Sequence, residues 1–215
     1  MKRILLLFVV ALLAVSSYAQ FNNPDNRAHF GLRLSANINS PSDISAGKIS
    51  FDGFKTGPGF SFGGVYNIPV WQNLYVEPGL MLWRDTYKDE WEGGFDDSGE
   101  PYNIESKVKK FGLSIPVMVG YRFDVFSRGG WSFFTGPELR IGFTGKECDD
   151  DGHSIDIYGD EGWANQVDCA WNVGTGINID KFYVGFTASL GMADMIKEQP
   201  KYRENRFCFS VGYNF

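Results

Sequence analysis

The chain has 215 residues, of which 43% are hydrophobic and 16% aromatic, and its 26 acidic and 20 basic side chains give a formal net charge of −6. This length accommodates one domain of ordinary size, and the acidic balance makes nucleic acid a poor partner. The 26 glycines, and apolar residues that alternate instead of recurring at helical spacing, indicate an all-β protein.

The first residues predict an export signal. A basic start, an apolar run over residues 4–15 and small residues up to Ala19 follow the order of a secretory leader. We expect a signal peptide over 1–19, a periplasmic segment over 20–28 and the folded domain over 29–215. The apolar run is shorter than the roughly 20 residues that a transmembrane helix needs. Cleavage of the signal peptide would remove Lys2 and Arg3, which leaves 18 basic against 26 acidic side chains and a net charge of −8.

Alternation along the remaining chain predicts eight strands. They cover residues 29–39, 59–68, 74–87, 111–123, 133–143, 171–179, 182–192 and 207–215. Successive residues of a strand point to opposite faces, and in each segment bulky apolar side chains occupy one face. Glycine, serine, asparagine and charged residues predominate on the other face. Val65 is the apolar exception in the second segment, and in the third this face is mixed, with Tyr75, Met81 and Trp83 on it.

The connections alternate in length. Those over 40–55, 88–107, 146–168 and 193–205 are long, whereas those over 69–73, 124–131 and 180–181 are short. Short periplasmic turns and long external loops are typical of outer-membrane barrels. Aromatic residues are expected to form a belt at each rim. The short-turn belt would contain Tyr66, Tyr121, Phe133, Phe182, Tyr213 and Phe215, and the long-loop belt Phe60, Phe111, Phe143, Trp171 and Phe207.

The less apolar face distinguishes a membrane barrel from a soluble carrier. It carries a set of charges that we expect to form a network in the lumen: Arg33, Glu77, Arg122, Glu138 and Arg140. Glu77 with Arg122 is the first expected pair. Eight strands leave an interior just wide enough for side chains, and a closed sheet satisfies every backbone group in hydrocarbon. The sequence therefore predicts a closed eight-stranded antiparallel up-and-down transmembrane β-barrel.

Several short motifs then carry a resemblance to a known family. They are Leu74-Tyr75-Val76-Glu77-Pro78-Gly79-Leu80, Leu113-Ser114-Ile115-Pro116-Val117, Gly136-Pro137-Glu138-Leu139, Gly174-Thr175-Gly176-Ile177 and Gly212-Tyr213-Asn214-Phe215. Over about residues 30–215 the chain resembles the small outer-membrane β-barrel domain common in Bacteroidota, including PorT-like proteins. The resemblance implies location in the cell outer membrane and an association with protein secretion. It also implies that Phe215 is the assembly signal read by the barrel-assembly machinery.

Three cysteines are an odd number for an exported protein. Cys148 and Cys169 lie at the two ends of the acidic loop, at opposite strand ends, so they either form a disulfide or remain free. Cys208 falls on the lumen face, where we expect a buried, unreactive thiol.

No catalytic, cofactor-binding or metal-binding residue is assigned. The acidic residues Glu147, Asp149, Asp150, Asp151, Asp156, Asp160 and Glu161 have oxygen ligands for calcium, but they lack the full EF-hand pattern, which favours a solvated loop. The two histidines, His29 and His153, fall at opposite rims. His153 with Ser154 and Asp156 is the one candidate nucleophilic cluster.

The leading interpretation is an outer-membrane barrel with a structural or interaction role and no enzymatic activity. Its expected partners are outer-membrane lipid, the assembly machinery during insertion, and a protein or glycan at the long loops. The loop aromatics that favour such a partner, or that pack on the loops themselves, are Trp91, Phe95, Tyr102, Tyr158, Trp163 and Tyr202. The alternatives are an enzyme that modifies outer-membrane lipid, a soluble periplasmic carrier with its apolar face inward, and a small pore.

Overall fold

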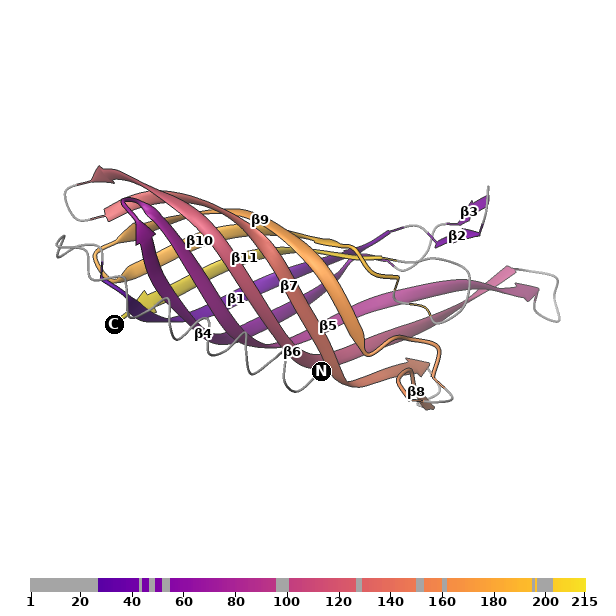
Figure 1. The fold of residues 1–215 in the computed structure, drawn as a ribbon. Helices are drawn as coiled ribbons and strands as arrows, with labels where there is room; N and C mark the ends of the chain where they lie inside the picture. The colour runs from indigo at the N-terminus through magenta and orange to yellow at the C-terminus, as the bar shows by residue number, and fades with distance from the viewer. Residues whose placement is uncertain are drawn as a thin grey trace.

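Eight long strands form the body of the protein in the computed structural model (Figure 1). The structure describes residues 27–42, 44–46, 49–51, 55–95, 101–126, 129–149, 153–159, 162–194, 196 and 203–215. The long strands are β1 (His29–Pro41), β4 (Gly57–Trp71), β5 (Leu74–Phe95), β6 (Pro101–Phe126), β7 (Gly129–Asp149), β9 (Val167–Ile179), β10 (Phe182–Gly191) and β11 (Glu204–Asn214). The short strands are β2 (Ile44–Ala46), β3 (Ile49–Phe51) and β8 (Ser154–Asp156). The expected signal peptide over 1–19 lies outside the described residues.

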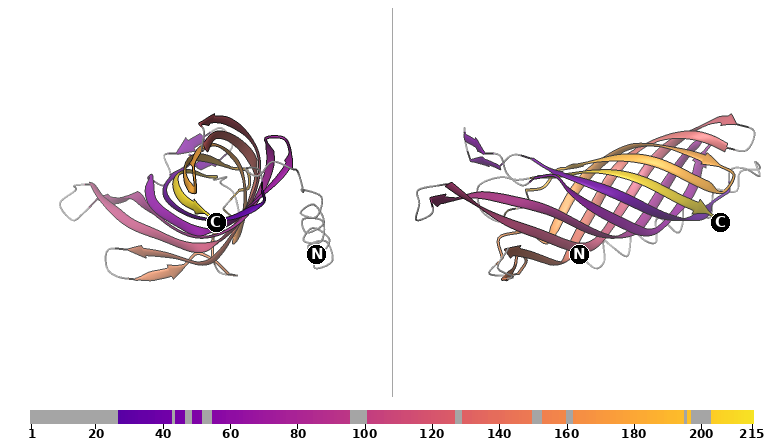
Figure 2. Two further views of the ribbon diagram at one scale, coloured as in Figure 1. Left: turned by 90° about the vertical axis from the view of Figure 1, so that its left-hand side faces the viewer. Right: turned by 180° about the vertical axis from the view of Figure 1, so that it is seen from behind.

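The eight long strands close into an antiparallel barrel. Each pairs with the next long strand along the chain, and β1 pairs with β11 to complete the ring. Viewed along the axis, the strands surround a central lumen (Figure 2). This confirms the predicted fold, in which every spanning strand has two hydrogen-bonded neighbours, as hydrocarbon requires. Within the described ranges, no helix has the length and apolarity needed to cross a membrane.

The two faces of the sheet are oriented as expected. Arg33 is 6% exposed and Arg140 is 2% exposed, whereas Leu34 is 53% and Phe209 is 56% exposed on the outer wall. A soluble carrier would show the reverse, because its apolar face would form the core. The soluble-carrier alternative is therefore wrong, and the outer wall is suited to lipid.

Two of the short connections are two-residue turns. Gln72 and Asp180 begin the turns after β4 and β9, and their φ angles are 46° and 52°. Two-residue hairpins favour turns with positive φ because the twist of such turns matches that of the paired strands. Aromatic side chains gather on the outer wall near this end, where the ring centroids of Phe182 and Tyr213 are 5.5 Å apart. We call this the short-turn end.

The opposite, long-loop end differs from the expectation of long irregular connections. β5 and β6 remain paired well past the barrel, as Lys88 with Lys107 and Trp91 with Ile104 show. β7 continues to Asp149 and pairs with β8, while β2 pairs with β3. These extensions project beyond the barrel in Figure 1. The expected loop over 88–107 was wrong because charged residues interrupt the apolar alternation there, although backbone pairing continues.

Candidate functional site

The half of the lumen nearer the long-loop end contains a network of buried charges, here called the outer cluster. Its members are Asp85, Lys110, Glu138, Arg140, Asp168, Glu204 and Arg206, each at most 9% exposed. Lys110 Nζ lies 3.4 Å from Glu204 Oε2, and Arg140 Nη1 lies 3.3 Å from Asp168 Oδ2. Arg206 forms an ion pair with Asp85. Four carboxylates thus meet three cations, a composition in which each buried charge has a partner of opposite sign.

Neutral side chains complete the outer cluster. Asn172 Nδ2 and Ser189 Oγ donate hydrogen bonds of 3.1 and 2.9 Å to Glu138 Oε2. Arg206 Nε donates to Asn39 Oδ1 at 3.2 Å, and its guanidinium lies 5.0 Å from the centre of the Trp83 ring. These contacts fix the charged groups in place, so the network fills this part of the lumen with protein.

A second network, here called the inner cluster, lies nearer the short-turn end. Arg33 Nη1 donates to Asn214 Oδ1 at 2.8 Å, and Arg33 Nη2 lies 3.8 Å from Glu77 Oε2. Asn67 Nδ2 also donates to Glu77 Oε2, at 2.9 Å. The Arg33 guanidinium lies 4.1 Å from the centre of the Tyr183 ring. This cluster joins β1, β4, β5, β10 and β11 from inside the barrel.

The expected pair of Glu77 with Arg122 is wrong. Glu77 is paired with Arg33, whereas the Arg122 guanidinium lies 5.4 Å from the centre of the Tyr75 ring. All five charges expected in the lumen lie on the face that points inward; four of them divide between the two clusters, and Arg122 belongs to neither. Glu138 and Arg140 belong to the outer cluster and Arg33 and Glu77 to the inner one.

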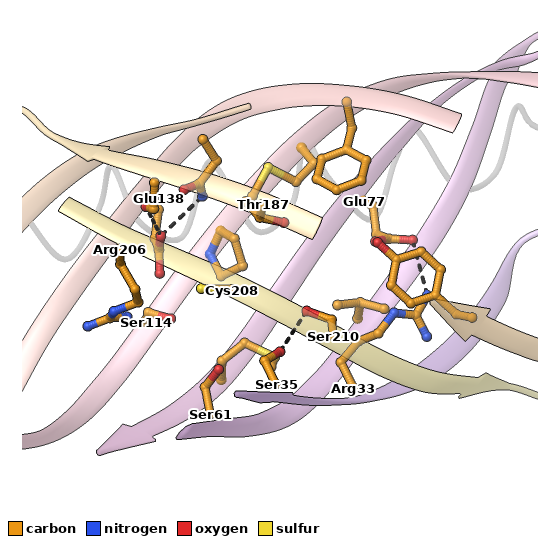
Figure 3. A pocket seen from close by; sticks show the side chains of 18 residues that line it. Arg33, Ser35, Ser61, Glu77, Ser114, Glu138, Thr187, Arg206, Cys208 and Ser210 are labelled. Carbon is orange, nitrogen blue, oxygen red and sulfur yellow. Dashed lines mark hydrogen bonds and ion pairs between the residues drawn. The ribbon is translucent and has the colours of Figure 1, made fainter. Parts of the chain in front are cut away.

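A cavity of about 100 Å³ separates the two clusters (Figure 3). Arg33 and Glu77 line one end and Glu138 and Arg206 the other, while serines and methionines line the wall between them. Ser35 and Ser210 form a 2.7 Å hydrogen bond across one side. At about 30 Å³ of liquid volume per water molecule, the cavity holds a few waters. Ligand pockets for drug-sized molecules run to about 300–1,000 Å³, so this cavity is too small for such a ligand.

The long-loop mouth of the barrel is covered by a small apolar core, here called the outer plug. Tyr87, Val108, Ile157 and Ala164 are fully buried in it, and Tyr158 and Trp163 pack against it. The Tyr158 ring lies so close to Gly142 and Gly145 that a Cβ atom at either position would collide with it. Tyr158 also lines a cavity of about 10 Å³ with Asp168 and Glu204 of the outer cluster. The plug therefore rests directly on the outer cluster.

The connection over residues 146–168, which carries the acidic residues, packs as part of the outer plug. Glu147 accepts hydrogen bonds from Ser106 Oγ at 2.9 Å and from Trp163 Nε1 at 3.2 Å. Tyr158 and Trp163 thus pack on the protein itself, which was one of the two alternatives for the loop aromatics. Among the residues that the structure describes, no group of three potential ligands could hold a metal ion. Asp150, Asp151, Asp160 and Glu161 lie outside those residues.

Of the two alternatives for Cys148 and Cys169, the structure has free thiols and no disulfide. Cys169 pairs with Leu139 of β7, nine residues away from Cys148 along the same strand. At roughly 3.3 Å per residue this separates the two cysteines by about 30 Å, whereas a disulfide needs Cα atoms within about 7 Å. All three cysteines are free, and Cys208 lines the lumen cavity. The two cysteines are separated because β7 continues to Asp149, six residues past the end of the predicted strand over 133–143.

The candidate nucleophilic cluster does not form a recognisable pocket. His153, Ser154 and Asp156 are exposed at β8, and neither lumen cavity includes any of them. His29 lies at the start of β1, at the short-turn end. The structure thus brings together the lumen charges and leaves the two histidines at opposite ends.

Five members of the outer cluster were missed in the sequence: Asp85, Lys110, Asp168, Glu204 and Arg206. Each continues the inward-facing alternation of its strand. Lys110 precedes Gly112 by two residues, and Arg206 precedes Cys208 by two. Asp85 lies within the predicted strand over 74–87, and extending the period-two pattern beyond the predicted strand ends would have found the other four.

The closed antiparallel barrel, its apolar outer wall and its charged lumen define a membrane β-barrel. Residues 18–197 match the family described as outer membrane protein beta-barrel domain. The chain belongs to this family, whose members reside in the outer membrane. No curated protein matches the chain.

Three solved structures have a similar arrangement of strands. Neisserial surface protein A is 14% identical with a TM-score of 0.49, covering 86% of this chain and 97% of that one. Ail of Yersinia pestis is 12% identical with a TM-score of 0.44, covering 87% and 99%. OprG of Pseudomonas aeruginosa is 14% identical with a TM-score of 0.45, covering 87% and 96%.

Proposed function

We propose that this protein is a non-conducting, non-enzymatic outer-membrane barrel whose external strand extensions dock a partner protein. The observation that carries the proposal is the combination of a filled lumen with strands far longer than a membrane requires. A function inside the barrel would need space that the two clusters and the plug occupy. The contact surface is then outside the membrane.

Strand length supports an external platform. A tilted strand crosses a bilayer in about 9–11 residues, whereas β5 has 22 residues and β6 has 26. The excess forms a paired hairpin that continues to Phe95 opposite Pro101. A paired hairpin is more ordered than an irregular loop, so it loses less conformational freedom when a partner binds.

The resemblance to PorT-like proteins suggests what kind of process the platform serves. We propose that the partner is a component of a protein-secretion assembly, which the barrel holds at the outer membrane. A lipid-modifying enzyme is the weaker alternative, because its candidate residues His153, Ser154 and Asp156 lie exposed on a short strand. Replacing His153 with Ala and analysing lipid A and phospholipid products tests that alternative.

Shortening the β5–β6 hairpin tests the docking role. In the shortened variant, residues 91–104 are replaced by Asn-Gly. This two-residue turn then connects Glu90 to Glu105, which are paired in the sheet. We expect affinity purification from intact outer membranes to recover a partner with the wild-type protein and to lose it with this variant. Secretion of exported proteins should fall in parallel.

A matched control removes another external hairpin. Deleting residues 44–51, which carry β2 and β3, shortens a different connection at the same rim and should leave the partner bound. Recovery of the same neighbours with and without the β5–β6 hairpin would show that it is not the docking element. Steady conductance of the wild-type protein in planar bilayers would contradict the non-conducting barrel.

A further inference from the structure

Five basic side chains form a continuous surface on the outer wall near the long-loop end, here called the cationic band. They are Arg84 and Lys88 of β5, Lys107 and Lys109 of β6, and Lys146 of β7, and all five are exposed. Strand pairing places Lys88 opposite Lys107 and Lys109 opposite Lys146. Side chains directly opposite on antiparallel strands have Cβ atoms about 4.5–5.5 Å apart, so the five charges form one compact group.

The band contains two like-charge pairs that are unfavourable on their own. Like charges directly opposite each other destabilise a pair of strands. In the described part of the chain, the ion pairs do not include Arg84, Lys107, Lys109 or Lys146. Asp156 of β8 lies opposite Lys146 and supplies one nearby carboxylate. An external anion would relieve the repulsion between Lys109 and Lys146.

The positive charge is confined to one side of the barrel. At the same rim, the outward residues of β1, β9 and β11 and the residue after β10 are uncharged: Ser40, Val167, Asn205 and Met192. Lys55, which is exposed and bridged to Lys88, adjoins the band on the β4 side. Arg203 is the nearest further cation on that side, and it is paired with Asp194 at 3.8 Å. The band is therefore a local feature of β5, β6 and β7, in contrast to a general excess of basic residues at this end.

The depth of the band is set by the aromatic residues beside it. Arg84 lies between Phe60 of β4 and Phe111 of β6 in the register of the sheet. Phe111 and Phe143 are in edge contact, with ring centroids 6.0 Å apart. Aromatic belts mark the boundary between hydrocarbon and headgroups. Lys109 and Lys146 occupy the next outward-facing positions beyond Arg84, and Lys88 and Lys107 the positions after those. These lysines lie further from the membrane centre than the aromatic residues, at the depth of lipid phosphates.

We propose that the cationic band binds the phosphate groups of lipids in the outer leaflet, with Lys109 and Lys146 as its central pair. Lysine and arginine donate charge-assisted hydrogen bonds to phosphate oxygens, and one phosphate between Lys109 and Lys146 screens their repulsion. Bound lipid would also hold the base of the β5–β6 hairpin at the membrane surface. The proposal is independent of the docking role, because lipid binding needs no partner protein.

The test compares lipid affinities in phosphatidylcholine nanodiscs that hold the full mature protein. The probe is lipid A carrying its phosphates, with dephosphorylated lipid A as the reference lipid. The test variant is K109Q/K146Q, and the matched control R27Q/K181Q removes two exposed cations from the short-turn end. A third variant, K109R/K146R, retains the charge. Retarded migration of unheated samples on a gel establishes that each variant has folded.

Each basic residue near an anionic surface contributes about 1 kcal/mol, so we expect K109Q/K146Q to bind phosphorylated lipid A roughly 10- to 30-fold more weakly. The control and the arginine variant should bind like wild type, and dephosphorylated lipid should bind weakly to all four proteins. Equal affinity of wild type and K109Q/K146Q, or of the two lipids, would overturn the proposal. The proposal would also be overturned if K109Q/K146Q bound lipid like wild type but no longer recovered a protein that copurifies with the wild-type barrel from outer membranes. The band would then be a protein interface.

Discussion

Lys110 and Glu204 join opposite walls of the barrel through an ion pair of 3.4 Å between Nζ and Oε2. In the ring of eight strands, β6 and β11 are four strands apart in either direction. Arg206 and Asp85 link β11 to β5 in the same region. Contacts of this kind connect strands that share no backbone hydrogen bonds. They stabilise the closed barrel from inside.

Breaking the Lys110–Glu204 pair should be costly. Glu204→Leu leaves the buried ammonium of Lys110 without its carboxylate, and removing one partner of a buried pair costs about 3–5 kcal/mol. Urea titration of the barrel refolded in lipid vesicles measures the change in unfolding free energy. The double variant Lys110→Met/Glu204→Leu should recover most of the loss, since no charge is then left alone. Equal stability of Glu204→Leu and wild type would refute the structural role of the pair.

Tyr158 should make stability depend on pH above 10. Burial, together with the negative charge of Glu204 and Asp85, raises the pKa of the Tyr158 phenol above its ordinary value. The unfolded chain therefore loses this proton near pH 10 while the folded protein keeps it. Because the unfolded state then binds fewer protons, unfolding free energy falls as pH rises. Urea midpoints between pH 9 and pH 11.5 should fall less steeply for Tyr158→Phe, and parallel curves for the two proteins would count against this account.

Depth in the membrane should decide the cost of a charge on the outer wall. Val211 and Tyr213 point outward from the same strand, β11, with Val211 nearer its middle. An arginine costs about 2–4 kcal/mol at the bilayer midplane and about 0–1 kcal/mol near the interface. Val211→Arg should therefore destabilise the refolded barrel more than Tyr213→Arg, by at least about 1 kcal/mol in vesicle urea titrations. The opposite order would place the membrane elsewhere on the wall.

Phe215 should matter more for assembly in cells than for stability. Its ring centroid lies 6.0 Å from that of Phe30 and 5.1 Å from that of Tyr213, and its backbone N–H donates to the Phe30 carbonyl at 2.9 Å. Aromatic pairs contribute about 0.5–1.5 kcal/mol each, so losing both pairs in Phe215→Ala should cost about 1–3 kcal/mol in vitro. If the assembly machinery reads this residue, the amount in the outer membrane falls severalfold, and Phe215→Tyr restores it. Normal membrane levels of Phe215→Ala would exclude that role.

Because its three cysteines are free, the protein should migrate identically on a gel with and without reductant. Cys169 is exposed on the outer wall, whereas Cys208 lines the lumen cavity. A membrane-permeant maleimide should label Cys169 much faster than Cys208, as judged by mass spectrometry of the folded protein in detergent. Faster migration of unreduced wild type that disappears in Cys148→Ser would contradict the separation of the two strand positions.

Much of the fold was predictable because a β-barrel is encoded locally. The alternation that sets Leu34 outward and Arg33 inward follows from strand geometry at each position, and eight such segments with alternating connection lengths define an up-and-down barrel. Strand ends were less predictable. Past the apolar belts, charged residues such as Lys88 and Lys107 interrupt the apolar alternation, although backbone pairing continues over 88–107.

The sequence by itself determined which side chains enter the lumen, since each residue's face depends on its parity within a strand. Only the tertiary structure decided which of them meet. Lys110 and Glu204 are 94 positions apart, and Arg33 rather than Arg122 reaches Glu77. Contacts across a barrel depend on the stagger between strands as the sheet closes, and a period-two pattern contains no information about that stagger.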